Sequence, residues 1–420
     1  MAVGPTGRPA EIELKSKPIL YTENGLRTAS AEETLAGVER LIESGFFTDI
    51  VRKVHKGSEL PYYVSWFVDP TDGLTREPHP GKGLSERQSK VSAALEGVER
   101  YCSKLHGNEE KITAAYRDLL PDAVDPTSFV LPADTTHRDS LSQEWVWGYS
   151  LTNRREVLVP ASLVFCPYDT DPHEHRICDY NSNGLAAGNC MEEAILQGLL
   201  EVVERDAWMI MEYNRLTMPD IDISESVPSS IREVARHLSS SGIQLTVKNI
   251  TTDIPIYTFG VFAEGEHDGD KAYAFAPGTH LFPGIALARS LTEAVQLYPQ
   301  LAGNSPWLAS GPTDHLCASG SRAEPFDSFG EPAISDVGAC VGESVRILDN
   351  HGSEVIVVDL SRPGTHFPVV RVLCSELQPI LNRTNPRFSK RLSRVPVELG
   401  YRDREPPAGY FEPRDLCGVM

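Results

Sequence analysis

The sequence lacks the features of a secreted, membrane or nucleic-acid-binding protein. No stretch of its 420 residues approaches the roughly 18 consecutive apolar residues that a membrane span needs, and the N-terminus has no apolar signal segment. Its eight cysteines form no C-x-x-C pair, which fits reduced thiols better than a disulfide framework. Only 39 basic residues stand against 59 acidic ones, and the net charge of -20 repels phosphate backbones and anionic membranes. We therefore expect a cytoplasmic protein that binds neither nucleic acid nor membranes.

The elements that the sequence does contain predict a mixed α and β fold. Two helices begin with capping boxes, Ser30 with Glu33 and Ser85 with Gln88, and Gly107 is expected to end the second helix. Further helices are predicted at 182–210 and 284–299. Segments rich in β-branched and aromatic residues predict strands at 61–68, 145–151, 156–165, 243–250, 256–263, 271–277, 354–360 and 368–374. Strands followed by helices recur along the chain, which favours an α+β protein with several sheets and helices packed on them.

The same pattern divides the chain into three parts. With 40% apolar residues, a chain of this length can bury a sizeable core. Residues 1–57 are expected to form an N-terminal extension with one amphipathic helix, and residues 58–384 the main domain. Residues 385–420, rich in arginine and proline, are expected to form a C-terminal tail.

Three of the predicted helices carry acidic and amide side chains on one stripe beside an apolar face. When side chains are placed about 100° apart, the helix at 182–210 has a polar stripe of Glu193, Gln197, Glu201 and Glu204. The neighbouring apolar arc holds Ile195, Leu199, Val202 and Val203. The helix that begins at Ser85 has a similar polar stripe of Ser92, Glu96, Glu99 and Arg100. The helix at 284–299 has a third, of Arg289, Glu293 and Gln296.

Such stripes have two explanations. Glutamates and arginines three or four positions apart are common on solvated helices, where each pair contributes a few tenths of a kcal/mol. Glutamates at this spacing also repel one another, so an acidic stripe is unfavourable unless a cation lies on it. If the three stripes converge, six carboxylates share one cleft: Glu96, Glu99, Glu193, Glu201, Glu204 and Glu293. Such a cleft suits Mg²⁺, and Arg100, Arg205 and Arg289 would meet the oxygens of a polyphosphate.

Three segments of the sequence resemble a known family. SAALEGVER (92–100), SNGLAAGN with EEAILQGLLEVVER (182–205) and RSLTEAVQ (289–296) are similar, in order and residue type, to the ATP-binding motifs of the YcaO superfamily. The resemblance implies a YcaO fold, in which several mixed or antiparallel sheets and their helices enclose a cleft for ATP and Mg²⁺ without a P-loop. The chain indeed has no G-x-x-x-x-G-K-[ST] motif. In YcaO enzymes a nucleophile adds to a peptide carbonyl carbon, the γ-phosphate of ATP is transferred to the amide oxygen, and loss of phosphate installs the nucleophile.

The resemblance also implies roles for residues at matching positions. Mg²⁺ would be bound by Glu96, Glu99, Glu193, Glu201, Glu204 and Glu293. The nucleotide would be bound by Ser92, Arg100, Asn189, Gln197, Arg205, Arg289 and Gln296, with Lys82 as a weaker match to a phosphate ligand. Catalysis would depend most on Glu201, Glu204 and Arg205. Residues 58–384 would then be the ATP-binding catalytic domain.

The choice of nucleophile is narrowed by the same resemblance. Azoline-forming members use a Cys, Ser or Thr side chain of the substrate peptide and commonly end in Pro-x-Pro-x-Pro, whereas this chain ends in PRDLCGVM and lacks the length of a fused leader-binding domain. It is more similar to the stand-alone members paired with TfuA, which put sulfide into a backbone amide. We therefore expect a thioamide-forming enzyme with a peptide or protein substrate and a TfuA-like sulfur-delivering partner. The alternatives are an azoline-forming cyclodehydratase and a non-catalytic ATP-binding accessory protein, and the sequence leaves open whether the protein is a homodimer.

Three further features have competing explanations. Four residues of zinc-ligand type have an irregular spacing that favours a solvated loop over a metal site: Cys166, His173, His175 and Cys178. Asp206 falls within the apolar arc of its helix, which favours a buried ion pair with an arginine over a frayed helix end. Cys190 could carry a persulfide near the nucleotide, or it could be a small apolar residue at a helix start, where its thiol pKa would be lowered.

Overall fold

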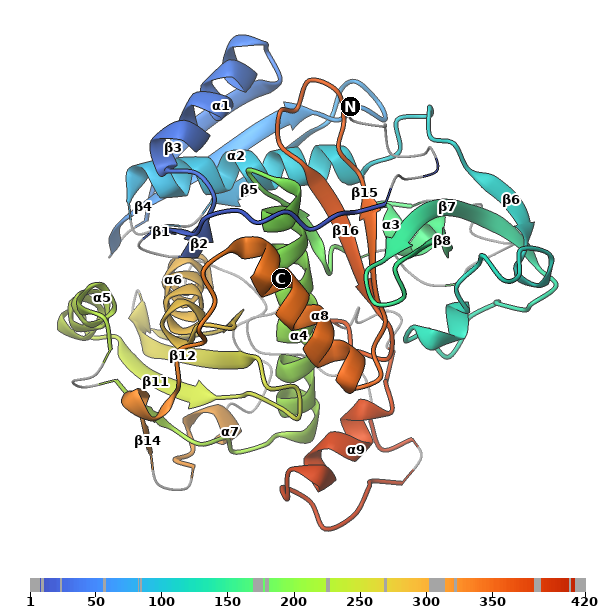
Figure 1. The fold of residues 1–420 in the computed structure, drawn as a ribbon. Helices are drawn as coiled ribbons and strands as arrows, with labels where there is room; N and C mark the ends of the chain where they lie inside the picture. The colour runs from blue at the N-terminus through green and yellow to red at the C-terminus, as the bar shows by residue number, and fades with distance from the viewer. Residues whose placement is uncertain are drawn as a thin grey trace.

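The computed structural model shows helices and several antiparallel sheets packed in layers (Figure 1). It describes residues 8, 11–22, 25–55, 58–81, 83, 85–168, 177, 181–223, 227–267, 270–301, 314–320, 323–380, 387–407 and 409–411. Within these residues three sheets have three or more strands, and helix α4 (Met191–Asn214) runs through the middle of the molecule. Twenty of the 24 residues of α4 are buried, so most of the helix surface contacts other elements.

The first sheet is antiparallel and lies near the N-terminus of the chain. Its strands, in spatial order, are β3 (Phe47–His55), β4 (Ser58–Val68) and β5 (Arg76–Gly81), with helices α1 (Ala31–Glu43) and α2 (Glu86–Ser103) packed beside them. Both predicted capping boxes are confirmed, because Ser30 and Ser85 each accept a hydrogen bond from the backbone N–H three residues later and the reciprocal bonds are present. Strands β3 and β4 pair with each other although they lie on opposite sides of the predicted end of the N-terminal extension.

The central sheet is buried on both faces. Its strands, in spatial order, are β6 (Ile112–Ala115), β7 (Ser142–Ser150), β15 (Val355–Asp359), β16 (Val369–Cys374) and β9 (Leu185–Ala187), and β8 (Arg155–Pro160) also pairs with β7. Along β15, Val355 and Val357 join the core formed with α4 and α8 (Val337–Asn350), whereas Ile356 and Val358 join the core formed with α2. Burial on both faces explains why this strand is a continuous apolar run.

Two glycines allow α4 to lie close against the central sheet. A Cβ atom on Gly198 of α4 would lie only 2.6 Å from the carbonyl oxygen of Gly184, which precedes β9. Gly184 has a φ of +77°, a conformation that favours glycine, and its carbonyl accepts a 2.7 Å hydrogen bond from Val372 N of β16. This close approach fixes the position of α4 relative to β9 and β16.

The third sheet packs against α4 on one face and against two other helices on the opposite face. Its antiparallel strands are β11 (Gln244–Asn249), β12 (Tyr257–His267) and β13 (Asp270–His280). Phe262 and Phe275 contact the C-terminal half of α4, and the other face is covered by α5 (Ser229–Ser240) and α6 (Pro283–Leu301). The remaining described elements are short: β1 (Leu20–Thr22) with β2 (Gly25–Arg27), β10 (Ile221–Asp222) with β14 (Glu324–Pro325), α3 (Ala161–Val164), α7 (Asp314–Cys317) and α9 (Arg391–Glu398).

Some predicted boundaries were wrong. The segment 156–165 is not one strand, since β8 ends at Pro160 and a helical turn, α3, follows. Within 182–210 the helix begins at Met191, as the alternative of a helix start at Cys190 implied, because the residues before it pair with β16 as β9. Helix α9 lies in the segment that was predicted to be a tail.

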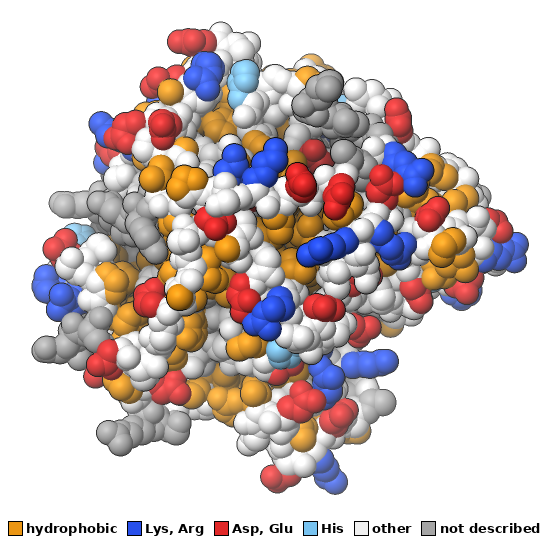
Figure 2. All heavy atoms as spheres, viewed as in Figure 1, with side chains coloured by type: hydrophobic (Ala, Val, Ile, Leu, Met, Phe, Trp, Pro, Cys, Tyr) orange, Lys and Arg blue, Asp and Glu red, His pale blue; other side chains and the backbone are white. Residues whose placement is uncertain are grey.

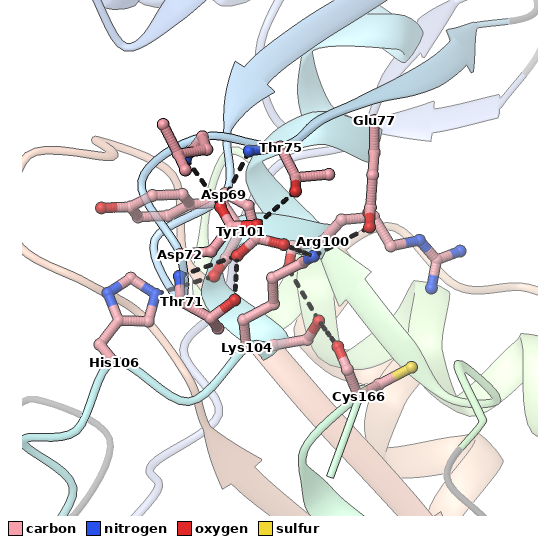
Figure 3. Close-up of polar contacts among 12 residues, drawn as sticks. Asp69, Thr71, Asp72, Thr75, Glu77, Arg100, Tyr101, Lys104, His106 and Cys166 are labelled. Carbon is pink, nitrogen blue, oxygen red and sulfur yellow. Dashed lines mark hydrogen bonds and ion pairs between the residues drawn. The ribbon is translucent and has the colours of Figure 1, made fainter. Parts of the chain in front are cut away.

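Helix α2 ends earlier than predicted because of Lys104. The backbone of this residue is extended, and its buried ammonium group donates hydrogen bonds to the carboxylates of Asp69 and Glu77, as Figure 3 shows. Burial acts to raise the pKa of Asp69, but hydrogen bonds from Lys104 and Thr71 hold this pKa below its usual value. The ion pairs of Lys104 with Asp69 and Glu77 hold the end of α2 against the first sheet. Gly107, the predicted end of the helix, has a positive φ in the loop beyond it.

The buried ion pair predicted for Asp206 is confirmed. Asp206 lies on α4 with an exposed fraction of 0%, and its Oδ2 atom lies 2.8 Å from Nη2 of Arg391 on α9. The same guanidinium lies 2.7 Å from Oδ1 of Asp253, and the backbone N–H of Gln378 donates a 2.8 Å hydrogen bond to Asp206. Arg391 therefore joins α9 to α4 and to the segment before β12.

The visible surface shows no single-sign charge field. On the face in Figure 2, lysine and arginine side chains are interspersed with aspartate and glutamate. Among the described helices, we find none whose length and apolar character would let it cross a membrane.

Candidate active site

The three predicted stripes face one cavity. A cavity of about 240 Å³ lies where α2, α4 and α6 meet β9 and the N-terminal segment. Its polar lining includes residues of each stripe: Ser92, Glu96 and Glu99 of α2, Gln197 and Glu201 of α4, and Arg289 of α6. An apolar part of the lining, which includes Val91, Leu95 and the three residues of β9, suits the base of a nucleotide.

The carboxylates of the cavity lie against arginines. Glu96 Oε1 accepts a 2.7 Å hydrogen bond from Arg100 Nη2, and Glu201 Oε1 lies 3.7 Å from Arg205 Nη2. Burial raises the pKa of Glu99 well above its usual value, and the nearby charge of Glu96 raises it further. Burial likewise raises the pKa of Glu201. Desolvation therefore disfavours the charged form of these carboxylates, and a bound cation would offset that effect.

The described residues do not form a complete metal cage by themselves. Among them, no three acidic, histidine or cysteine side chains lie close enough together to hold a metal ion. A metal bound at Glu96, Glu99 or Glu201 would therefore need further oxygens from water or from a ligand. Mg²⁺ favours this mode, because it keeps several waters and bridges a few carboxylates to phosphate oxygens.

Two arginines have donors that fit a polyphosphate. Arg289 Nη1 donates a 2.5 Å hydrogen bond to Gln197 Oε1, while its buried Nε atom has no hydrogen-bond partner among the described residues. The Nε atom of Arg205 is also buried and, within the described part of the chain, has no hydrogen-bond partner. A buried donor of this kind on a cationic side chain suits an anionic ligand. The residues present thus fit a nucleotide with its Mg²⁺ ion.

Glu193 lies apart from the cavity lining. Its carboxylate accepts hydrogen bonds from Thr28 N (3.0 Å), Thr28 Oγ1 (2.9 Å) and Asn189 Nδ2 (3.1 Å), and it lies 3.7 Å from Arg27 Nε. Asn189 does line the cavity, and its Oδ1 atom accepts a 2.9 Å hydrogen bond from Thr34. In this structure Glu193 therefore orients Asn189 and binds the N-terminal segment, and a role as a metal ligand stays a prediction.

Glu204 and Glu293 surround Arg205. Glu204 is buried and lies 3.9 Å from Arg205 Nη1, and Glu293 on α6 is half-buried. Burial acts to lower the pKa of Arg205, but the charges of Glu201, Glu204 and Glu293 together raise it. Neither Glu204 nor Glu293 belongs to the lining of the cavity. Both are thus placed to act on Arg205, and their metal-binding role stays a prediction.

Several predicted residues lie outside the described part of the chain. These are Lys82, the side chain of Gln296, and His173, His175 and Cys178 of the loop with zinc-type residues. Cys166 of that loop is described, and burial raises its thiol pKa. The prediction of a lowered thiol pKa for Cys190 was wrong: although Cys190 is the N-cap of α4, burial outweighs its position and raises the pKa.

Sequence reasoning missed three residues of the site region. Arg27 of β2 and Thr34 of α1 line the cavity, although their segment was expected to be an extension outside the catalytic domain. Arg371 of β16 is buried, and its charge acts on both Glu99 and Glu201. Arg371 could have been noticed in the sequence, because it is the charged residue within the apolar strand 368–374. Nothing in the local sequence indicated Arg27 or Thr34.

Comparisons with known proteins assign the chain to a family. The family model described as a YcaO cyclodehydratase that binds ATP and Mg²⁺ matches residues 80–378. The chain belongs to the YcaO family, as its three motifs predicted.

Solved structures and a curated relative support the assignment. A heterocyclase in complex with substrate and cofactor is 26% identical, with a TM-score of 0.87 over 97% of this chain and 59% of its own. YcaO from Methanopyrus kandleri, solved with AMPPCP and Mg²⁺, is 26% identical, with a TM-score of 0.70 over 86% of this chain and 95% of its own. A Rhizobium leguminosarum protein, named as uncharacterized and in the tfuA 3' region, is 26% identical over 74% of this chain and 79% of its own. The chain spans only 50 to 59% of the length of the heterocyclase and of other curated relatives.

Proposed function

We propose that the protein uses ATP and Mg²⁺ to activate a backbone amide of a peptide. The proposal rests on the convergence of Glu96, Glu99 and Glu201 with Arg289 on one cavity. The similarity to a YcaO protein solved with AMPPCP and Mg²⁺, and to a heterocyclase solved with substrate and cofactor, supports it.

Each group of residues has a distinct task in this proposal. Bound ATP supplies a phosphoryl group that converts the amide oxygen into a leaving group. Glu96, Glu99 and Glu201 hold Mg²⁺, while Ser92, Asn189, Gln197 and Arg289 orient the nucleotide. Arg205 offers a planar guanidinium between Glu201 and Glu204, where it can stabilise charge that develops on phosphate oxygens.

For the nucleophile we propose external sulfide and, as product, a thioamide. Sulfide adds to the carbonyl carbon, the carbonyl oxygen leaves as phosphate, and each turnover converts one ATP to ADP with no change of oxidation state. The location of the Rhizobium relative in a tfuA region supports a TfuA-like protein as the sulfur-delivering partner.

Azoline formation is the second candidate. It is favoured by the description of the family as a cyclodehydratase and by the heterocyclase structure with a TM-score of 0.87. In that reaction a Cys, Ser or Thr side chain of the peptide replaces sulfide, and the peptide loses water. A non-catalytic accessory protein would bind ATP without consuming it, although a scaffold gains nothing from burying carboxylates at a desolvation cost.

Mass spectrometry of the peptide product distinguishes these functions. We expect that this protein, co-expressed with a peptide or protein encoded beside its gene and with a TfuA-like partner, replaces one backbone oxygen of the substrate by sulfur. ATP consumption should require sulfide or the partner, and it should persist when the residue after the modified carbonyl is Gly or Ala.

Other products would change the assignment. A peptide that loses water without sulfide, and whose modification stops when the following Cys, Ser or Thr is changed to Ala, would assign azoline formation. Unmodified peptide and no ATP consumption with either nucleophile would contradict both catalytic functions.

A further inference from the structure

A second, smaller cavity lies along α4, and most of the residues that line it are apolar. It lies between α4, β16 and the segment that follows β16, and its volume is about 60 Å³. Its apolar lining includes Phe129, Val130, Leu163, Val202 and Leu377. Asn183 and Arg205 belong to the polar part of the lining.

This cavity adjoins the nucleotide cavity through two elements. On α4, Glu201 lines the nucleotide cavity, whereas Val202 and Arg205 line the second cavity. Glu201 Oε1 lies 3.7 Å from Arg205 Nη2, so this pair joins the two linings. Asn183 lines the second cavity and precedes β9, whose three residues line the nucleotide cavity. A molecule that fills the second cavity therefore lies next to Arg205, which in the proposed function stabilises charge on phosphate oxygens.

The arginines at this cavity have acidic neighbours within the protein. The charges of Glu201 and Glu204 act on Arg205. The charge of Arg371, which also belongs to the lining, acts on Glu99 and Glu201. Because these arginines have counter-charges, the mainly apolar lining favours a neutral ligand over an anion.

One buried amide supplies a hydrogen-bond donor for such a ligand. Asn183 is 7% exposed, and its Nδ2 atom has no hydrogen-bond partner among the described residues. Its backbone N–H donates a 3.0 Å hydrogen bond to Asn181 Oδ1, which also accepts one from Arg371 Nη2. The backbone of Asn183 is therefore held in place, while its side-chain amide costs free energy unless an acceptor binds it. A peptide carbonyl oxygen is such an acceptor.

The size of the cavity defines the kind of side chain that it admits. One water needs roughly 10–15 Å³ of cavity volume, so a volume of about 60 Å³ holds roughly four to six groups of that size. The branched aliphatic side chains of leucine and valine fit this volume. An aromatic side chain and a nucleotide are larger than the cavity.

We propose that this cavity binds an aliphatic residue of the peptide substrate, next to the amide that is activated. The aliphatic side chain packs against Val130, Leu163 and Leu377, and the backbone carbonyl of the same residue accepts a hydrogen bond from Asn183 Nδ2. Such a subsite rests on the proposed function, because only a peptide substrate brings this residue beside Arg205. It adds a sequence preference that the proposed function leaves open.

Small neutral probes test the subsite in the full-length protein saturated with AMPPCP and Mg²⁺, which fill the nucleotide cavity. The probes are N-acetylleucinamide, N-acetylglycinamide and N-acetylphenylalaninamide, and NMR titration gives the Kd of each. We expect the leucine probe to bind at least about tenfold more tightly than the glycine probe, because it buries an aliphatic side chain. The phenylalanine probe should bind no more tightly than the glycine probe. Equal affinity for the leucine and glycine probes, or tightest binding of the phenylalanine probe, would overturn the inference.

Two variants connect the leucine probe to this cavity. Val130→Phe fills the cavity from its half-buried edge and should reduce the affinity to that of the glycine probe, whereas Val51→Phe, at an exposed position of β3, should not. Asn183→Leu keeps nearly the same shape without the donor and should weaken binding about fivefold, the effect of one neutral hydrogen bond. Asn350→Leu, at the exposed end of α8, is its matched control. Unchanged affinity in both Val130→Phe and Asn183→Leu would place the probe elsewhere and overturn the inference.

Failure of the proposed function gives a different result from failure of the subsite. Val130 and Asn183 do not line the nucleotide cavity, so both variants should bind AMPPCP with Mg²⁺ like the wild type, which also shows that they are folded. A wild-type protein that does not bind AMPPCP contradicts the proposed function. A wild-type protein that binds AMPPCP but does not distinguish the leucine probe from the glycine probe overturns the subsite alone.

Discussion

Glu201→Gln is expected to lower ATP turnover by about two to three orders of magnitude, the scale of effect seen when one electrostatic contact to a transition state is removed. Glu201 lines the nucleotide cavity and lies 3.7 Å from Arg205, so its charge both holds Mg²⁺ in our proposal and positions the guanidinium. The free energy of unfolding should change little, because a neutral amide of the same shape replaces a half-buried carboxylate whose charged form is disfavoured by desolvation.

The effect of Glu201→Gln on ATP turnover needs a matched control variant on the protein surface. Glu39→Gln makes the same chemical change at an exposed position of α1 and should turn over like the wild type. Initial rates of phosphate release, measured together with chemical unfolding of each variant, separate loss of activity from loss of fold. Normal turnover by Glu201→Gln would show that the family motif was carried over to the wrong residue.

Arg391→Met should destabilise the protein by about 3–5 kcal/mol, because it leaves the fully buried carboxylate of Asp206 without its counter-charge. The change also releases Asp253 and thereby removes one of the contacts that join α9 to the rest of the fold. Urea unfolding of the purified variants measures the loss.

Two companion variants identify the cause of the stability loss in Arg391→Met. Arg394→Met lies on the same helix but pairs with Glu398 in solvent, so it should cost well under about 1 kcal/mol. The double variant Asp206→Asn with Arg391→Met removes the buried charge as well, and it should be more stable than Arg391→Met alone. If Arg394→Met were as damaging as Arg391→Met, the loss would come from the helix rather than from the buried pair.

Local features of the fold could be predicted from the sequence because they depend on neighbouring residues. The capping boxes at Ser30 and Ser85 depend on side chains three positions apart, and the apolar arc of Ile195 and Leu199 follows from the helical period. The helical period also predicted which faces carry Glu96, Glu99 and Glu201, and the resemblance to a family indicated that their helices converge. The three residues do line one cavity.

Features that depend on distant segments could not be predicted in this way. Glu193 lies on the same stripe as Glu201, but two turns nearer the N-terminus of α4, where Arg27 and Thr28 reach it from a segment more than 150 residues away along the chain. The partner of Asp206 was correctly expected to be an arginine, but its identity, Arg391, depended on a helix that was not predicted. Such contacts arise from tertiary packing, which leaves no periodic signal in either segment.

Joint binding of ATP and Mg²⁺ in one cavity can be measured as the thermal stability of the wild-type protein with ATP, in the presence of Mg²⁺ or of a chelator. Because half-buried carboxylates share the cavity with Arg27 and Arg289, nucleotide and metal should bind as a unit. With ATP at about 100 times its Kd, mass action predicts a stabilisation of about 2.7 kcal/mol with Mg²⁺ and little with the chelator. An equal rise in Tm under both conditions, or no rise under either, would contradict joint binding.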